Sequence, residues 1–426
     1  MQIPFSPPYI DDSVINEVVD TLKSGWLTTG PKVKALEQEI RSYSGARQVL
    51  CVNSWTSGAI MMLRWLGLKD GDEVIVPAYT YCATALAVIH AGGRPVMVDS
   101  GEDFNISIEG IRRAITERTK AIIPVDLAGF PCDYDEIMKL VREPEINVRF
   151  HATSPVQHKL GRILILNDAA HSLGAIYNSY KRTGAETDVA IFSLHAVKNV
   201  TTAEGGAICL NLPEPFDNEA LYTELRMMSL NCQTKDALAK SKAGGWRYDI
   251  VGLGMKINLP DVNAAIGLAE LREYPKLLLK RKRTFLKYNR AFANFDWAIL
   301  PPSEAKGKET SYHLYALRIK NITEEQRDEM IDIITLRRVY LNVHFIPMPM
   351  LTFFKEQGYD INDYPQAYKN FSQEISLPVY PQMTDEMVAY VIDSIVDAYY
   401  KVAKVPKIST ASCKEKSAPK MEFLAP

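Results

Sequence analysis

The sequence predicts an α/β protein whose central sheet is largely parallel and covered by helices on both faces. From residue 48 to about 211, short apolar runs rich in β-branched residues alternate with helical segments. Such alternation, with strands that are apolar throughout, is typical of parallel sheets buried on both sides. In these sheets ligands bind outside the carboxyl ends of the strands. Functional residues are therefore expected just after the apolar runs.

Seven apolar runs predict the strands of this sheet: QVLCV (48–52), EVIVP (73–77), RPVMV (94–98), KAIIPV (120–125), RILIL (162–166), DVAIFS (188–193) and GGAICL (205–210). Helices are expected between several of them, in the segments GAIMMLRWLGL, YCATALAVIHAGG, SIEGIRRAITERT and DYDEIMKLVRE. Residues 140–162 interrupt the alternation and are predicted to form an inserted surface loop.

The 426 residues exceed what one hydrophobic core usually organises, so a second domain is expected. A long, basic helical stretch begins near residue 265, and residues 311–400 contain further strand and helix patterns, among them VYLNVHF. We therefore expect a large domain over residues 1–265 and a smaller α+β domain over 266–403. The tail 404–426, rich in Lys, Pro and Ser, is predicted to be disordered.

Composition excludes several function classes. The net charge of -2, from 49 basic and 51 acidic residues, gives no case for nucleic acid or an anionic membrane as partner. The seven histidines and six cysteines are too scattered to predict a metal site. Most cysteines lie inside apolar runs, the N-terminus lacks the features of a signal peptide, and no stretch is apolar enough to span a membrane. A cytoplasmic location is expected.

Lys198 is a candidate nucleophile. It follows the strand and turn DVAIFSLHAVK and precedes NVTTAEGGA, so its long side chain can reach a cofactor at the strand end. A lysine nucleophile must be held deprotonated and facing a carbonyl group. Taken alone, the pattern fits a solvent-exposed loop lysine better.

Asp168 strengthens the case for a cofactor. It lies two residues after the end of the strand RILIL, in the segment NDAAHSLGA, and thirty residues before Lys198. A carboxylate in this place can meet the ring nitrogen of pyridoxal phosphate and keep it protonated, which makes the ring an electron sink. The alternative, a cap for the following turn, is about equally good for Asp168 alone.

Two further elements complete the candidate site. In CVNSWTSGAIMMLRW, a helix start with the hydroxyls of Thr56 and Ser57 suits a phosphate group, and Ser193 can add a third hydroxyl. In VPAYTYCAT, the ring of Tyr79 or Tyr81 can stack on a flat cofactor, although each fits core packing equally well. Together, four elements at strand ends of one sheet favour a pyridoxal-phosphate site.

At these residues the chain resembles the DegT/DnrJ/EryC1/StrS family of sugar aminotransferases, over roughly residues 4–400. The resemblance includes the segments SGWLTTGP, EVIVPAYTYCATALAV, PVDLAGFPCDYDEI, NDAAHSLGA, SLHAVKNVTTAEGGAI, MKINLPDVNAAIG, VHFIPM and SLPVYPQMT in family order. NDAAH together with SLHAVKN looks closest to the branch that acts on UDP-linked 4-keto sugars, including the 4-amino-arabinose enzyme of lipid A modification. The resemblance implies the aspartate-aminotransferase fold (fold type I), with a mostly parallel seven-stranded sheet.

The resemblance also implies roles for single residues. Lys198 is the Schiff-base lysine and proton shuttle, Asp168 pairs with the pyridine nitrogen, and His171 lies near the ring hydroxyl. Tyr81 stacks on the ring. The residues implied to bind the phosphate are Thr56, Ser57, Ser193 and, from the neighbouring subunit of a homodimer, Asn258. The residues implied on the substrate side are Gly25, Trp26, Leu27, Thr28 and His344. Arg247, in GGWRYD, is a further candidate for sugar or phosphate contact.

The implied reaction transfers an amino group from L-glutamate to a nucleotide-linked keto-sugar, by way of pyridoxamine phosphate, for surface polysaccharide such as lipopolysaccharide or capsule. A UDP-4-keto-6-deoxyhexose is the expected substrate type. Family 3-dehydratases carry histidine in place of the lysine, so Lys198 argues against that alternative. A catalytically silent homologue is a second alternative, and the lack of G-x-G-x-x-G after a strand disfavours a nicotinamide enzyme. Trp55 departs from the small residue usual in the family's phosphate turn.

Overall fold

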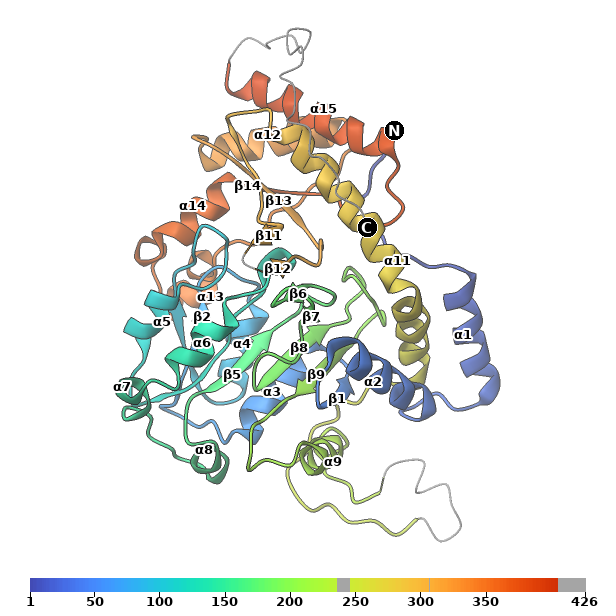
Figure 1. The fold of residues 1–426 in the computed structure, drawn as a ribbon, viewed down its shortest axis with the longest axis vertical. Coiled ribbons are helices and arrows are strands. Elements are labelled where there is room, and N and C mark those ends of the chain that lie inside the picture. The colour runs from blue at the N-terminus through green and yellow to red at the C-terminus, as the bar shows by residue number, and fades with distance from the viewer. Residues whose placement is uncertain (236–245, 306, 405–426) are drawn as a thin grey trace, which may run out of the picture.

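The computed structural model describes residues 1–235, 246–305 and 307–404. Its centre is a seven-stranded sheet with strand order β1-β9-β8-β5-β4-β2-β3 (Figure 1). Strand β9 runs antiparallel to both of its neighbours, and the other paired strands are parallel. The strands are β1 (Gln48–Val52), β2 (Glu73–Pro77), β3 (Arg94–Val98), β4 (Thr119–Ile122), β5 (Leu164–Asp168), β8 (Val189–Ser193) and β9 (Gly206–Leu210).

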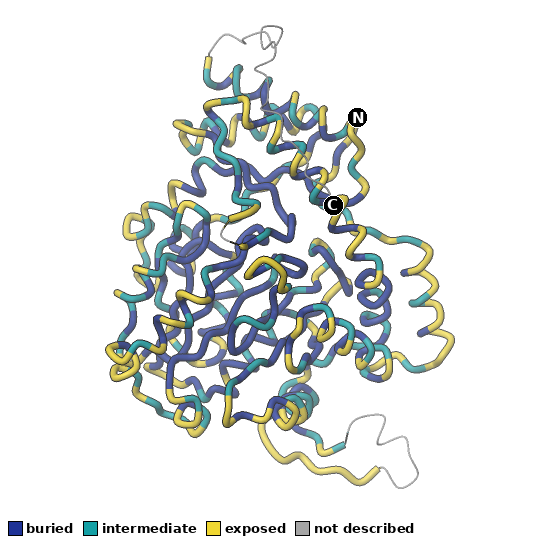
Figure 2. The backbone as a smooth tube through the Cα atoms, in the orientation of Figure 1, coloured by how far each residue is buried: buried dark blue, intermediate teal, exposed yellow. Residues whose placement is uncertain are grey.

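Helices cover both faces of this sheet because its strands are apolar on both sides. In β8, Val189 and Ile191 join one apolar cluster, whereas Ala190 and Phe192 join another on the opposite face. The first face is covered by α3 (Trp55–Trp65), α4 (Ala83–His90) and α9 (Asn218–Met228). The second is covered by α2 (Pro31–Ser44), α5 (Ile108–Ala114), α6 (Tyr134–Leu140) and α11 (Asp261–Phe292). The buried strands run through the middle of the molecule in Figure 2.

The C-terminal part is built on a three-stranded antiparallel sheet in the order β10-β13-β14. Its elements are β10 (Ala298–Ile299), β13 (Tyr315–Ile319), α12 (Glu324–Leu336), α13 (Thr352–Glu356), α14 (Pro365–Gln373), β14 (Glu374–Leu377) and α15 (Asp385–Val402). A second small sheet, in the order β11-β12-β6-β7, joins the two parts: β6 (Ile176–Tyr177), β7 (Lys181–Arg182), β11 (Glu304–Ala305) and β12 (Lys308–Glu309).

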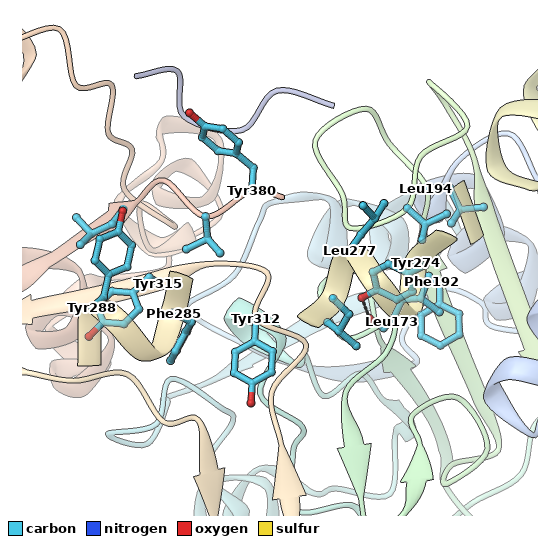
Figure 3. Packing of buried hydrophobic residues seen from close by; sticks show 14 of the residues in the cluster. Leu173, Phe192, Leu194, Tyr274, Leu277, Phe285, Tyr288, Tyr312, Tyr315 and Tyr380 are labelled. Atoms are coloured by element: carbon cyan, nitrogen blue, oxygen red, sulfur yellow. Dashed lines mark hydrogen bonds between the residues drawn. The ribbon is translucent and has the colours of Figure 1, made fainter. Parts of the chain in front are cut away.

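Helix α11 connects the two parts without a break, and it crosses the domain boundary that the sequence predicts at 265/266. Its residue Tyr274 packs beside Phe192 of the large sheet, whereas Tyr288 packs beside Tyr315 of the small one (Figure 3). One apolar cluster thus extends from one sheet to the other. Pro275 lies inside the helix, directly after Tyr274. The division at residue 265 stays a prediction.

Several expectations need correction. Residues 140–162 do not form a simple surface loop, because they contain α7 (Pro144–Asn147) and α8 (Pro155–Leu160). The buried amide of Gln157 accepts a hydrogen bond from Thr153 N (2.8 Å) and donates to Leu66 O (3.2 Å), which ties the segment to the core. VYLNVHF is no strand either, since it contributes only isolated bridges at Val339 and Asn342.

The N-terminus adds elements that the alternation pattern did not include. Helix α1 (Asp12–Ser24) precedes α2 and packs against α11. Before it, Ile3 pairs with Val339, so the first residues of the chain cross to the C-terminal part. Beyond Lys404, the predicted tail lies outside the residues that the structure describes. None of the described helices is both long and apolar enough to cross a membrane.

Candidate active site

A cavity of about 520 Å³ lies at the carboxyl ends of the parallel strands. Its walls come from the segments that follow β1, β2, β5 and β8, from the N-terminal residues Phe5 and Ser6, and from His344 and Phe345 of the C-terminal part. Its volume is that of a site for a small-molecule ligand or cofactor. The cavity therefore occupies the place that the strand pattern predicts for a binding site.

Lys198 lines this cavity on the turn after β8. Burial lowers the pKa of its amine to about 8, although the carboxyl of Asp168 acts in the opposite direction. The neighbouring Asn199 fixes the turn, since its amide donates to Tyr274 Oη (3.0 Å) and to Ser311 O (2.9 Å). A lysine with this pKa is unprotonated in about one molecule in ten at pH 7, far more often than a free lysine.

Asp168 ends β5 and lines the same cavity. Thr84 Oγ1 donates to its Oδ2 (3.0 Å), and Ala170 N donates to its Oδ1 (3.2 Å). Burial nevertheless raises the pKa of this carboxyl to about 7. A cationic N–H donor placed in the cavity would keep the carboxyl ionised, and a protonated pyridine nitrogen is such a donor.

Two buried histidines stand beside these residues as neutral rings. Ala128 N donates to His171 Nδ1 (3.2 Å), so the ring proton of His171 is on Nε2. The Asn199 amide nitrogen already donates to two other groups, so its oxygen faces His313 Nδ1 (2.9 Å) and accepts from it. Burial holds the pKa of both histidines well below the usual range. The two rings lie 4.5 Å apart.

The N-terminus of α3 forms a third wall. Ser54 caps the helix by accepting from Ser57 N (3.1 Å), and Ser54 and Thr56 line the cavity together with Ser193. Hydroxyls beside a helix N-terminus suit a phosphate group. Gly206 allows this packing, because a Cβ there would lie 2.6–2.8 Å from backbone atoms of Ser54 and Trp55.

Trp55, the departure from the family pattern, is 5% exposed. It belongs to the apolar cluster under α3, α4 and α9 and also lines the cavity.

The sequence left open which tyrosine faces the site. Tyr81 lines the cavity and lies 5.6 Å from the ring of Phe345, whereas Tyr79 is fully buried and donates to His344 O (2.7 Å). Tyr79 is thus a core residue.

Half of the predicted site residues share the cavity. Those that line it are Thr56, Tyr81, Asp168, His171, Ser193, Lys198 and His344. Those that do not line it are Gly25, Trp26, Leu27, Thr28, Ser57, Arg247 and Asn258. The Ser57 hydroxyl instead donates to Asn53 Oδ1 (2.5 Å), and the Arg247 guanidinium lies over the exposed Trp246 ring at 5.0 Å.

The segment from Gly25 to Thr28 lies beside Asn258 instead. Asn258 Nδ2 donates to Thr29 Oγ1 (2.7 Å), and Asp261 N donates to Leu27 O (3.0 Å). The carboxylate of Asp261 accepts from three backbone N–H groups at the start of α2, those of Gly30, Lys32 and Val33. The candidate substrate segment and Asn258 therefore form one unit, outside the cavity of their own subunit.

Sequence reasoning missed several cavity residues, among them Ser54, Thr84, His313 and Phe345. Ser54 could have been found, because it stands three residues before Ser57 in a typical capping position. Thr84 and His313 gave no local signal, since their roles depend on how α4 and the segment before β13 pack against the strand ends.

The fold and this site define a pyridoxal-phosphate-dependent enzyme: an amine of lowered pKa, a buried carboxyl and a helix N-terminus bound one cavity on an aminotransferase fold. The chain belongs to the DegT/DnrJ/EryC1/StrS aminotransferase family, whose model matches residues 8–396. It is 34% identical over 404 residues to the spore coat polysaccharide biosynthesis protein SpsC of Bacillus subtilis, covering 93% of this chain and 96% of SpsC.

Solved structures agree with this assignment. The apo form of Spr1654 from Streptococcus pneumoniae, assigned as a sugar aminotransferase, has a TM-score of 0.90 and 41% identity, over 95% of this chain and 99% of that one. Spr1654 has also been solved with pyridoxal phosphate and with pyridoxamine phosphate. Helicobacter pylori PseC, an aminotransferase of pseudoaminic acid biosynthesis, has a TM-score of 0.82 and 25% identity, over 94% and 100% of the two chains. The protein is a pyridoxal-phosphate-dependent sugar aminotransferase.

Proposed function

We propose that this enzyme transfers the amino group of L-glutamate to a nucleotide-linked keto-sugar, of the UDP-4-keto-6-deoxyhexose type or a related UDP-4-keto sugar, in the cytoplasm. The product would enter a surface polysaccharide or glycoconjugate. The observation that carries the proposal is that Lys198 and Asp168 face one cavity, each with a pKa moved toward neutrality by burial. The relatives SpsC and PseC, named for polysaccharide and sugar-acid biosynthesis, support the substrate class.

When bound, pyridoxal phosphate supplies an aldehyde that carries the amino group and a ring that accepts electrons. The residues of this chain supply the rest. Asp168, which accepts a hydrogen bond from Thr84, would keep a proton on the ring nitrogen, and the unprotonated Nζ of Lys198 would move a proton between carbon atoms. His171, whose ring proton is on Nε2, and Tyr81 would contact the cofactor from the cavity wall. Ser54, Thr56 and Ser193, which line the cavity at or beside the start of α3, would hold the phosphate.

A shared active site in a homodimer is part of the proposal. Residues 246–253 follow the segment after α9 and form an exposed run in Figure 2 that includes Trp246 (70% exposed) and Leu253 (90%). Such a row of large apolar side chains is typical of a surface that another chain covers. The same segment leads to Asn258, which does not line the cavity of the subunit that contains it. In the dimer, Asn258 and residues 25–28 would enter the cavity of the neighbouring subunit.

The charges on this segment fit a nucleotide diphosphate. Arg247 and Lys256 are both exposed, and Lys256 Nζ donates to Asn258 Oδ1. Among the described residues that line the cavity there is no arginine. A cation for the diphosphate, or for the carboxylate of the amino donor, would therefore come from Arg247 of the partner subunit.

Two experiments test the proposal. The purified enzyme is incubated with L-glutamate and a panel of UDP- and dTDP-linked keto-sugars, and release of 2-oxoglutarate is measured. We expect turnover with UDP-linked 4-keto sugars, and turnover with none of the nucleotide-linked sugars would refute the substrate assignment.

The shared site is tested by mixing subunits. Lys198→Ala and Asn258→Ala are each expected to inactivate the enzyme, and refolding them together makes mixed dimers. If Asn258 acts on the neighbouring cavity, one site of every mixed dimer has both residues intact, and about a quarter of wild-type activity returns. If each site is formed by one subunit, no activity returns. Sedimentation of the wild type measures the dimer directly.

A further inference from the structure

Glu374, a buried carboxyl residue, contacts the cavity residue His344 but does not itself line the cavity. Glu374 and Ser376 are two residues apart on β14 and so point to the same side of the strand. Ser376 Oγ donates to Glu374 Oε1 and lies 2.8 Å from His344 Nδ1. Glu374 Oε2 accepts from the backbone N–H of His344 (3.0 Å). One carboxyl therefore holds both the backbone and, through Ser376, the ring of a cavity residue.

Three other polar groups face Glu374. They are the guanidinium groups of Arg318 on β13 and Arg327 on α12, and the phenol of Tyr79. Arg318 donates to Asn370 Oδ1 (2.6 Å), and Arg327 donates to Phe371 O (2.6 Å) and to the backbone oxygen of Glu374 (3.1 Å). Glu374 is fully buried, and burial raises its pKa to about 8 in spite of these neighbours. The carboxyl can therefore hold or release a proton near neutral pH.

His344 lines the cavity, and its second ring nitrogen, Nε2, lies beside the amide of Asn342. Val343 N donates to Asn342 Oδ1 (2.8 Å), so the amide nitrogen of Asn342 is the atom that faces His344 Nε2, at 3.5 Å. Nε2 therefore accepts from this amide, and Nδ1 carries the ring proton. Burial and the nearby Lys198 lower the pKa of His344 to about 3, so the ring stays neutral and can only exchange one tautomer for the other.

We propose that Glu374, Ser376 and His344 form a proton relay that delivers a proton from the buried carboxyl to a substrate atom in the cavity. In the loaded state Glu374 is protonated and donates to Ser376 Oγ, Ser376 donates to His344 Nδ1, and Nε2–H points into the cavity. In the discharged state each hydrogen bond is reversed and Nε2 is bare. Both hydrogen bonds of the relay, between Ser376 Oγ and Glu374 Oε1 and between His344 Nδ1 and Ser376 Oγ, are present in the structure, and reversing their directions interconverts the two states.

The step is balanced without any further reactant. Nε2 loses its proton to the substrate atom, Nδ1 gains the proton of the serine hydroxyl, and Ser376 gains the proton of Glu374. No covalent bond between heavy atoms changes in the protein, and one proton leaves the carboxyl for the substrate. Amination of a keto group releases the carbonyl oxygen as water, and that oxygen needs an acid. This assignment of the receiving atom rests on the proposed function, whereas the relay itself does not.

The test reads the tautomer of His344 without any turnover. Imidazole 15N chemical shifts are recorded across pH in the cofactor-loaded protein, with His344→Gln used to assign the signal. In the wild type we expect the proton of His344 to be on Nε2 below about pH 8 and on Nδ1 above it. In Glu374→Gln, the amide nitrogen donates to Ser376 permanently, because the amide oxygen must accept from His344 N–H. The proton then stays on Nε2 at every pH.

A matched variant controls for the loss of a buried carboxyl. Glu37 is also buried, with a pKa raised to about 7, but it accepts from Cys51 N and Tyr222 Oη far from the cavity. Glu37→Gln should leave the tautomer change of His344 as in the wild type. Ser376→Ala should abolish it by breaking the relay. A wild type without a tautomer change, or a Glu374→Gln protein that keeps it, overturns the proposal.

Kinetics give an independent readout. If the substrate class is correct, kcat of the wild type falls above about pH 8 as the relay loses its proton, and Glu374→Gln lowers kcat about 10- to 100-fold and removes that fall. A protein without turnover on any sugar but with the expected tautomer change would refute the proposed substrate and leave the relay standing.

Discussion

Replacing Thr84 with valine tests how the enzyme keeps Asp168 ionised. The substitution removes the hydroxyl that donates to Asp168 Oδ2 (3.0 Å) and nearly keeps the side-chain volume. Thr84 is 1% exposed, so water cannot take the place of the hydroxyl. A hydrogen bond to a charged group contributes about 1.5–3 kcal/mol. Because only the ionised carboxylate gains this bond in full, its loss raises the pKa of Asp168 by about one to two units.

The protonated ring nitrogen of the cofactor pairs with the ionised carboxylate of Asp168. The free energy lost with the Thr84 hydrogen bond is therefore also lost from the free energy of cofactor binding. We expect Thr84→Val to bind pyridoxal phosphate about 10- to 100-fold more weakly at neutral pH. The assay is an absorbance titration of cofactor-free protein, with thermal unfolding to show that the variant is folded. Thr84→Ser keeps the hydroxyl and should bind nearly as the wild type does. A valine variant within twofold of the wild type, or a serine variant equally weakened, would refute the reasoning.

Five further predictions concern other residues. Borohydride reduction followed by peptide mapping should place the cofactor's mass on Lys198, and Lys198→Ala should show none. Affinity for pyridoxal phosphate should rise with pH through about 7 as Asp168 ionises, and Asp168→Asn should abolish this rise. The cofactor-free protein should lose stability as the pH rises from about 4 to 7, because Asp168 ionises first in the unfolded chain, and urea unfolding of Asp168→Asn should show a smaller loss over this range, since Glu37 and Glu374 still contribute to it. Gly206→Ala should displace the start of α3 and weaken cofactor binding at least about tenfold in the same titration. Arg162→Leu leaves its buried aspartate partner unpaired and should cost about 3–5 kcal/mol of stability in urea unfolding.

The central sheet could be predicted from sequence because its strands are buried on both faces. Each of the seven apolar runs overlaps one of its strands, and three of them match to the residue: Gln48–Val52, Glu73–Pro77 and Arg94–Val98. The sites of Lys198 and Asp168 followed from the same pattern, since strand ends of one sheet meet at one edge. The chain's own periodicity therefore indicated where the cavity lies.

Contacts between distant segments could not be predicted. His313 reaches the cavity through Asn199, and Glu374 reaches it through Ser376 and His344, so neither role has a local signal. The segment VYLNVHF has strand composition, but its backbone pairs only at single bridges with Ile3 and Ser376. Val339 is buried, and Leu341, Val343 and Phe345 are partly buried against the apolar clusters, so these apolar residues pack without strand pairing.

The unbroken course of α11 limits how the two parts of the molecule can move. Its 32 residues form a rod of about 48 Å. Pro275 lacks the N–H that continues the helical ladder, so bending is easiest at this point. The preceding Tyr274 is bonded to Leu173 O (2.6 Å) and to the amide of Asn199. The point where the helix bends most easily therefore lies next to the residues that hold the turn of Lys198, and a bend there would leave this turn fixed to the large sheet.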